Sequence, residues 1–222
     1  VSTPCRHGLT FTGFGRTMGA PLSMLNFFAP IGRTGYGVLS YNLIRAYDQH
    51  VSKEIILFPT AMEFQNDLVR RWIANASKFK KTDPSIMVHQ ASWLSHFCGM
   101  PMIGFPTFEM DEFLEQEVAI LKALDFILQP SQWGKKILEN HGFKNVHIVP
   151  EGYDPAIYCR ELSLRQKLER IQRQGVSFVH VGKFEARKSS DEILRCFLRA
   201  CDEGRERANF CFHACNPFDS EW

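Results

Sequence analysis

Short apolar segments alternate with helical patterns along most of this chain, and this alternation restricts the fold more than any other feature. The apolar segments are typical of buried strands and lie at residues 22–28, 55–58, 85–89, 100–105 and 125–129. Between them, apolar residues recur at helical spacing at residues 38–49, 64–73 and 109–124. Strands that alternate with helices favour a parallel sheet covered on both faces. The sequence therefore predicts a doubly wound, Rossmann-like α/β domain that ends near Val149.

A proline and glycine cluster at residues 150–155 marks the boundary of that domain. Beyond it we predict a charged helix, a strand, a second helix and a last strand, at residues 162–174, 177–181, 191–201 and 209–215. The predicted parts are a flexible N-terminal arm at 1–20, an N-terminal Rossmann-like domain at 21–150, and a partial C-terminal domain at 151–222. Two strands are too few for a covered sheet, so we expect the last part to pack on the first domain, on a partner or on further sequence.

The overall composition argues against several classes of function. The net charge of +2 disfavours nucleic acid as the main partner, because binding to a phosphate backbone normally needs a concentrated basic surface. No apolar run approaches the roughly 18 residues of a membrane span. The first twenty residues lack the apolar core of a signal peptide. We therefore expect no integral membrane segment and a cytoplasmic location.

Seven cysteines, an odd number, are scattered along the chain. This usage favours reduced thiols in a reducing compartment. Cys211, His213 and Cys215 alternate along one predicted strand and so share a face, but no Cys-x2-Cys pair accompanies them. We predict a packing role for this set and no metal site, with zinc binding as the alternative.

Residues 182–197 combine a strand end, two spaced lysines and the start of a helix. Lys183 and Lys188 supply positive charge, and the helix that opens near Ser190 supplies free backbone N–H groups. This combination, with Gly182 at the turn, predicts a site for the phosphate groups of a small molecule. The alternative is an ordinary strand-turn-helix with solvated lysines.

The stretch before this loop carries a second pattern, which begins with a helix start at Pro130-Ser131. Gly142, the strand VHIV and the turn Pro-Glu-Gly-Tyr-Asp at residues 150–154 follow it. Together with the lysine loop, the pattern resembles the family-4, glycogen-synthase-like glycosyltransferases of the GT-B fold. The resemblance covers roughly residues 22–217 and is most specific over the last hundred. One departure is Ser189, which stands where the family usually has glycine.

The resemblance implies a retaining glycosyltransferase that uses a nucleoside-diphosphate sugar bound between two Rossmann-like domains. The loop at residues 32–37 would then face the donor phosphates and the acceptor, with Gly35, Tyr36 and Gly37 close to the ligand and Arg33 less so. Gly182, Lys183 and Lys188 would bind the donor diphosphate, and the two lysines would stabilise it as a leaving group. No separate cofactor and no metal ion is implied. A tight structural turn without a ligand is the alternative for residues 32–37.

Two further side chains follow predicted strand ends. His89 ends the strand at residues 85–89, where its side chain can project into a cleft, although a structural histidine is the alternative. Glu109 stands where many relatives in the resembled family carry a histidine and some a glutamate. Its alternative role is that of a helix-opening carboxylate. Ser131 is predicted to be a helix N-cap.

The family also uses a Glu-x7-Glu element further along the second domain, and no pair of glutamates with that spacing lies between the lysine loop and Trp222. We therefore interpret the chain as truncated and expect it to turn over sugar nucleotide poorly by itself. The alternative function is a non-catalytic binding or assembly module built on a glycosyltransferase scaffold. The sequence leaves open the donor base and sugar, an acceptor that is a glycan, lipid or small molecule, and the oligomeric state, a homo-oligomer included.

Overall fold

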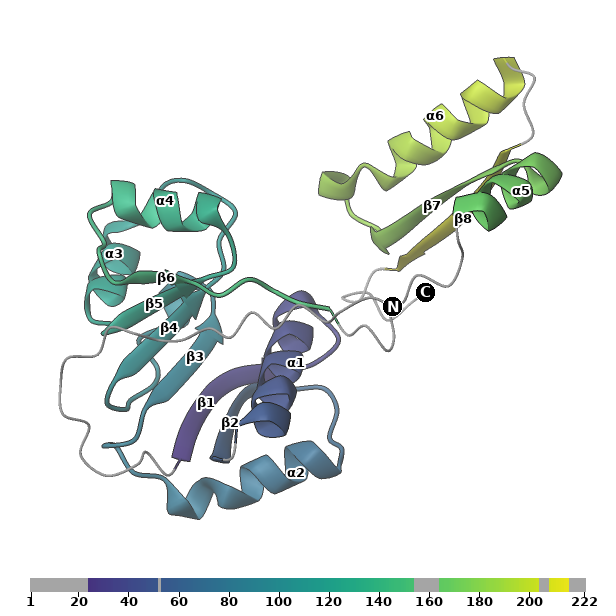
Figure 1. The fold of residues 1–222 in the computed structure, drawn as a ribbon. Helices are drawn as coiled ribbons and strands as arrows, with labels where there is room; N and C mark the ends of the chain where they lie inside the picture. Colours follow the sequence, from purple (N-terminus) through teal and green to yellow (C-terminus); the bar gives the residue numbers. More distant parts are fainter. Residues whose placement is uncertain (1–23, 52, 154–163, 204–207, 216–222) are drawn as a thin grey trace. The chain divides into compact units, whose positions relative to one another are not determined.

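Two units make up the chain, Val1–Glu151 and Gly152–Trp222. The computed structural model describes residues 24–51, 53–153, 164–203 and 208–215. The N-terminal arm predicted at residues 1–20 lies outside the described residues, and so does Asp154 of the predicted boundary turn. Figure 1 shows the elements of both units.

The first unit is built on a six-stranded sheet in the order β2-β1-β3-β4-β5-β6. Every neighbouring pair in it is parallel, so the predicted parallel sheet is confirmed, and the unit is Rossmann-like in its general kind. The strands are β1 Met24–Ile31, β2 Glu54–Met62, β3 Ser85–His89, β4 Met102–Pro106, β5 Phe126–Gln129 and β6 Val146–Ile148.

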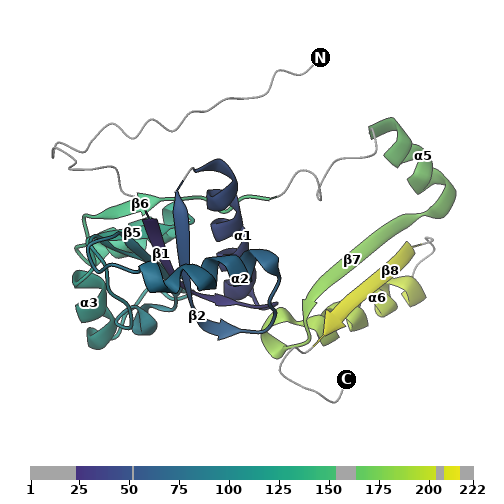
Figure 2. The same ribbon diagram turned by 90° about the horizontal axis from the view of Figure 1, so that it is seen from below.

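Helices cover both faces of this sheet because its strands are apolar on both sides. On one face, Ile44 of α1 (Gly35–His50) and Trp72 of α2 (Asp67–Ala74) join the alternate residues of β1 in one buried cluster. The opposite face carries the short helix η2 (Ala91–Trp93), α3 (Glu115–Lys122) and α4 (Gln132–Asn140). Adjacent residues of β3 face opposite sides of the sheet. Val88 packs in the cluster with α1 and α2, and Met87 packs in a second buried cluster, with η2, α3 and α4. Figure 2 shows the first unit from below.

Several element boundaries differ from the predicted ones. The helix predicted at residues 109–124 begins only at Glu115, because the Glu117 carboxylate accepts a hydrogen bond from the Leu114 N–H (3.0 Å) and caps the helix there. Strand β1 runs to Ile31 and α1 begins at Gly35, so the loop predicted at residues 29–37 shortens to residues 32–34. As predicted, Ser131 caps α4, where its hydroxyl accepts from the Gly134 N–H (3.0 Å).

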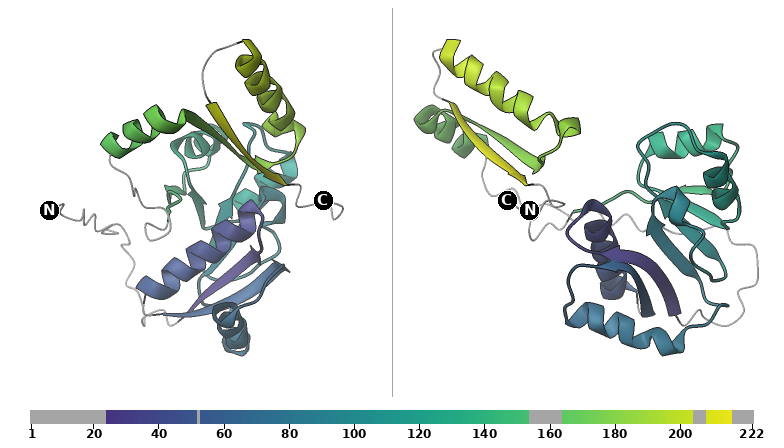
Figure 3. Two further views of the ribbon diagram at one scale, coloured as in Figure 1. Left: turned by 90° about the vertical axis from the view of Figure 1, so that its right-hand side faces the viewer. Right: turned by 180° about the vertical axis from the view of Figure 1, so that it is seen from behind.

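The second unit contains two parallel strands, β7 (Val176–Lys183) and β8 (Ala208–Cys215). Helix α6 (Ser190–Glu203) packs on one face of the pair, where the ring of Phe197 lies 4.7 Å from that of Phe210. Figure 3 shows α6 running along the two strands. The remaining elements are α5 (Leu164–Gln174) and the short helix η3 (Ala186–Lys188). On the opposite face of β7, Val179 and Val181 are 65% and 70% exposed.

Candidate functional site

The first unit places a tight loop at the carboxyl end of β1, residues 32–34, directly before α1. An added Cβ at Gly37 would lie 2.7 Å from the Cα of Gly32, whereas one at Gly35 would meet nothing within 4 Å. Gly37 is therefore required by the close packing of α1 against the loop. Open space beside the backbone, which a ligand needs for close approach, lies at Gly35.

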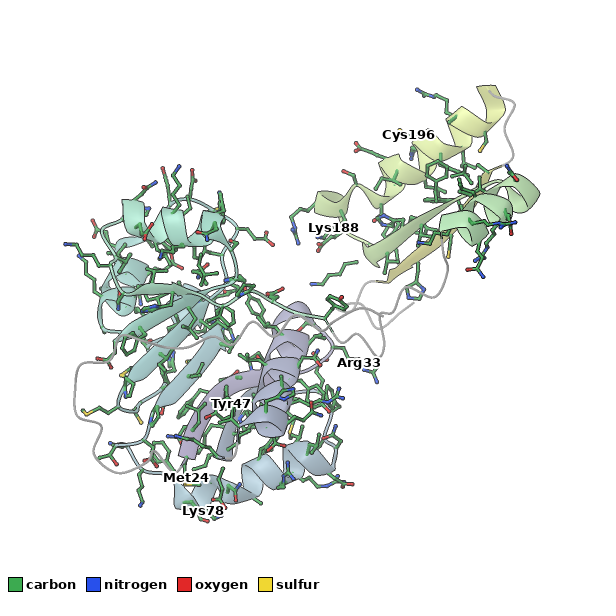
Figure 4. The ribbon with its side chains drawn as sticks, viewed as in Figure 1. Met24, Arg33, Tyr47, Lys78, Lys188 and Cys196 are labelled. Carbon is green, nitrogen blue, oxygen red and sulfur yellow. The ribbon has the colours of Figure 1, made fainter. Side chains whose placement is uncertain are left out.

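A carboxylate that was not predicted from the sequence holds this loop in place. The Arg33 N–H donates to Oε2 of Glu63 (2.7 Å), and the Glu63 N–H donates to the Ile31 carbonyl (2.8 Å). Glu63 directly follows β2, which extends past its predicted end at Phe58 to Met62. No motif marked Glu63, because only the longer strand brings it to the loop. The Arg33 side chain extends outward from this loop (Figure 4).

Three aromatic rings stack at the end of β3. The ring of His89, the last residue of β3, lies 5.7 Å from that of Tyr36 with 8° between their planes. The ring of His89 also stacks with that of Trp93, with 4.7 Å between the ring centroids and 26° between the ring planes. The structure thus brings together Tyr36 and His89, which the sequence predicted separately. Trp93 was not predicted to belong to the site, although an aromatic residue shortly after a strand-end histidine is a signal that could have indicated it.

A hydrogen bond to the His89 ring determines which of its two nitrogens carries the proton. The Gln90 N–H donates to Nδ1 (2.9 Å), which therefore has to be unprotonated, so the neutral ring carries its proton on Nε2. Partial burial, followed by the nearby His96, lowers the pKa of His89 below its usual value. His89 is thus suited to donate a hydrogen bond from Nε2 rather than to accept a proton there.

The end of β4 lies beside the end of β3. Pro106 pairs with His89 in the sheet, and the Thr107 N–H donates to the His89 carbonyl (3.3 Å). Thr107 Oγ1 is buried and has no hydrogen-bond partner among the residues that the structure describes. Glu109 follows on the same segment and is exposed. The structure thus places Glu109 at the same edge of the sheet as His89.

In the second unit, the predicted lysine loop connects β7 to α6. Gly182 and Lys183 end β7, and Lys188 ends η3 and is exposed. The next residue, Ser189, has a left-handed backbone with φ 49° and ψ 33°. Helix α6 begins directly after it, at Ser190, as the sequence predicted. The side chain of Lys188 extends outward from the turn before α6 (Figure 4).

The first residue of α6 fastens this loop to β7. Ser190 is 2% exposed, and its Oγ lies 3.0 Å from Nε2 of His180 and 3.5 Å from the Lys183 carbonyl. His180 in turn stacks on Phe212 of β8 (5.0 Å). A buried hydroxyl and a stacked imidazole therefore hold the helix start at a fixed place relative to the strand end. The first turn of α6 also carries Asp191 and Glu192.

The described residues offer neither a group of metal ligands nor a helix that could span a membrane. No group of three or more histidine, cysteine or acidic side chains in the described part of the chain could hold a metal ion. Cys211 and His213 lie on β8, and Cys211 is a free, exposed thiol. No helix within the described ranges is long and apolar enough to cross a bilayer.

The predicted site residues fall into one set in each unit. Gly35, Tyr36, Gly37, His89 and Glu109 belong to the first, and Gly182, Lys183 and Lys188 to the second. Comparisons of the chain with protein-family models, with curated proteins and with solved structures find no match. The indications of function therefore lie in these two sets and their chemistry.

Proposed function

We propose that this chain is a glycosyltransferase, or part of one, that transfers a sugar with retention from a nucleoside-diphosphate sugar to an acceptor. The observation that carries the proposal is the backbone of Ser189, which has a positive φ of 49° between Lys188 and α6. Glycine adopts this conformation most easily. The resembled family has glycine at this position, so the backbone supports the resemblance where the side chain departs from it.

Electrostatics give each part of the lysine loop a role in the proposed reaction. Lys183, Lys188 and the N–H groups at the start of α6 offer positive charge and hydrogen-bond donors to a diphosphate. As the bond to the sugar breaks, negative charge develops on this leaving group, and the same groups stabilise it. The two acidic side chains in the first turn of α6 limit that stabilisation, so we assign the larger part to the lysines.

The first unit contributes the acceptor side of the proposed reaction. Open space at Gly35 and the Nε2–H of His89 lie at the carboxyl edge of the sheet, where open α/β sheets bind ligands. Glu109 offers a carboxylate at the same edge, able to accept a hydrogen bond from a sugar hydroxyl. No metal ion and no separate cofactor enters the proposal.

Calorimetric titration with UDP- and GDP-sugars tests this proposal. We expect heat of binding from one of the two nucleotide classes. Lys188→Ala should weaken that binding about tenfold or more, because an interaction with a charged group contributes about 1.5–3 kcal/mol. Lys167→Ala, which removes the same charge from α5, is the matched control and should bind as the wild type does. The proposal is wrong if neither nucleotide class binds.

One observation favours a second candidate function, an assembly module that joins two copies of the chain. Val179 and Val181 expose most of their side chains on the face of β7 away from α6, and exposed apolar patches mark interaction surfaces. Sedimentation velocity of the wild type and of Val179→Ser/Val181→Ser separates the two functions. Self-association that the double variant loses, together with no nucleotide binding, favours the assembly module.

A further inference from the structure

Trp93 is held rigidly although it is not part of the core. Its neighbours in the turn after β3, Ala91 and Leu94, are 3% and 1% exposed and belong to the second buried cluster. The Trp93 N–H donates to the Gln90 carbonyl (3.0 Å), and the Leu94 N–H donates to the Ala91 carbonyl (3.2 Å). The turn is therefore fixed by its own hydrogen bonds and by buried neighbours, while Trp93 itself is 47% exposed.

Two histidines orient the indole. The imidazole of His89 stacks with it at 4.7 Å. The ring of His96 lies 5.6 Å away at 45°, and Nδ1 of His96 lies 3.0 Å from the Trp93 carbonyl oxygen. The stack with His89 and the tilted contact with His96 restrict the rotamer freedom of the ring, so a ligand that stacks on its remaining face has little ordering entropy to overcome.

We infer that the face of the Trp93 indole opposite His89 is a stacking platform for the ring of a carbohydrate acceptor. This inference rests on the proposed glycosyl transfer, in which the nucleotide is bound by the lysine loop and the acceptor by the first unit. A pyranose has an apolar C–H face, which suits an indole, and a rim of hydroxyl groups, which suit the Nε2–H donor of the adjacent His89.

Nuclear magnetic resonance tests this inference on the full chain. The probes are the methyl glycosides of glucose, galactose, mannose and N-acetylglucosamine, each observed by saturation transfer from the protein. We expect transfer to the ring protons of at least one glycoside and a matching shift of the Trp93 indole N–H signal. Trp93→Ala should weaken binding about fivefold or more, which corresponds to about 1 kcal/mol of stacking, and Trp93→Phe should restore part of it.

Trp133 on α4 provides the matched control, because it is 50% exposed and contacts Phe108 at 5.8 Å. Trp133→Ala should bind the glycosides as the wild type does. The inference is overturned if no glycoside binds the wild type, or if Trp93→Ala binds as well as Trp133→Ala. The indole N–H shift in the wild type decides the question independently of how the variants fold. Glycoside binding without nucleotide binding in the calorimetric titration would contradict the proposed function alone.

Discussion

Gly35 and Gly37 stand two residues apart at the start of α1, yet only Gly37 is closely packed. A Cβ at Gly37 would overlap the backbone of Gly32, which cannot move aside as a flexible side chain can. We expect Gly37→Ala to lower the free energy of unfolding by about 1–3 kcal/mol, as overpacking does. Gly35→Ala, which meets open space, should change it by less than about 1 kcal/mol. Urea unfolding of both variants measures this difference, and equal losses would contradict it.

The Ser189 backbone costs free energy because a side chain disfavours the left-handed region. Ser189→Gly should raise the stability of the second unit by about 0.5–1 kcal/mol. Glycine relieves the backbone strain, and its larger conformational entropy in the unfolded chain offsets part of that gain. Ser189→Val should lower it, since a β-branched residue fits this region worst. Hydrogen exchange of the α6 amides reports both changes. A lower stability in Ser189→Gly would mean that the serine side chain, not the backbone, matters there.

The lowered pKa of His89 gives its stability contribution a defined pH dependence. In the unfolded chain the imidazole titrates near 6.5, so between that pH and the lower folded pKa the unfolded state binds more protons. Stability therefore rises with pH through this window and falls as the solution becomes more acidic than pH 6.5. Urea unfolding at pH 7.5 and 5.5 should show a larger loss for the wild type than for His89→Gln. Equal losses in the two proteins would rule out His89 as the source.

Helix starts differ in how they are capped. The Ser131 hydroxyl accepts from the Gly134 N–H at the start of α4, whereas Thr34 makes no such side-chain bond at the start of α1. Ser131→Ala should therefore cost about 1 kcal/mol, and Thr34→Ala should cost clearly less. Thermal unfolding monitored by circular dichroism compares the two variants. A similar decrease in both would show that the Ser131 bond contributes little.

The helices and strands were largely predictable, because the spacing of apolar residues along the sequence reflects which side chains are buried. The residues of strand β3 and the start of α6 were both predicted from the sequence. Both left a local signal, which was a short apolar run for β3 and the lysine loop followed by Ser190 for α6. Glu63 was not predictable in this way, and Trp93 was indicated only as an aromatic residue shortly after a strand-end histidine. Their contacts with Arg33 and His89 depend on where a strand ends and how a turn is oriented, and tertiary packing decides both.

The two units of the chain differ in how much apolar surface they bury. Among the described residues, every buried apolar side chain lies in the first unit, between Met24 and Val146. In the second unit Ser190 is the buried side chain, and the valines of β7 are largely exposed. Since apolar burial is the main favourable term in folding, at about 25 cal/mol per Å², the first unit has the larger reserve of stability.

This difference predicts that the chain unfolds in two steps, with the second unit opening first. Amides of β7 and β8 should exchange with solvent at least about tenfold faster than those of β1 and β3, because their protection requires only the opening of a small two-stranded sheet. Native-state hydrogen exchange read by mass spectrometry measures each strand separately. Leu121→Ala, which removes a fully buried side chain of α3, is the internal control: it should speed exchange in the first unit and leave β7 and β8 unchanged. Equal protection of all four strands, or a response of β7 to Leu121→Ala, would show instead that the two units fold as one.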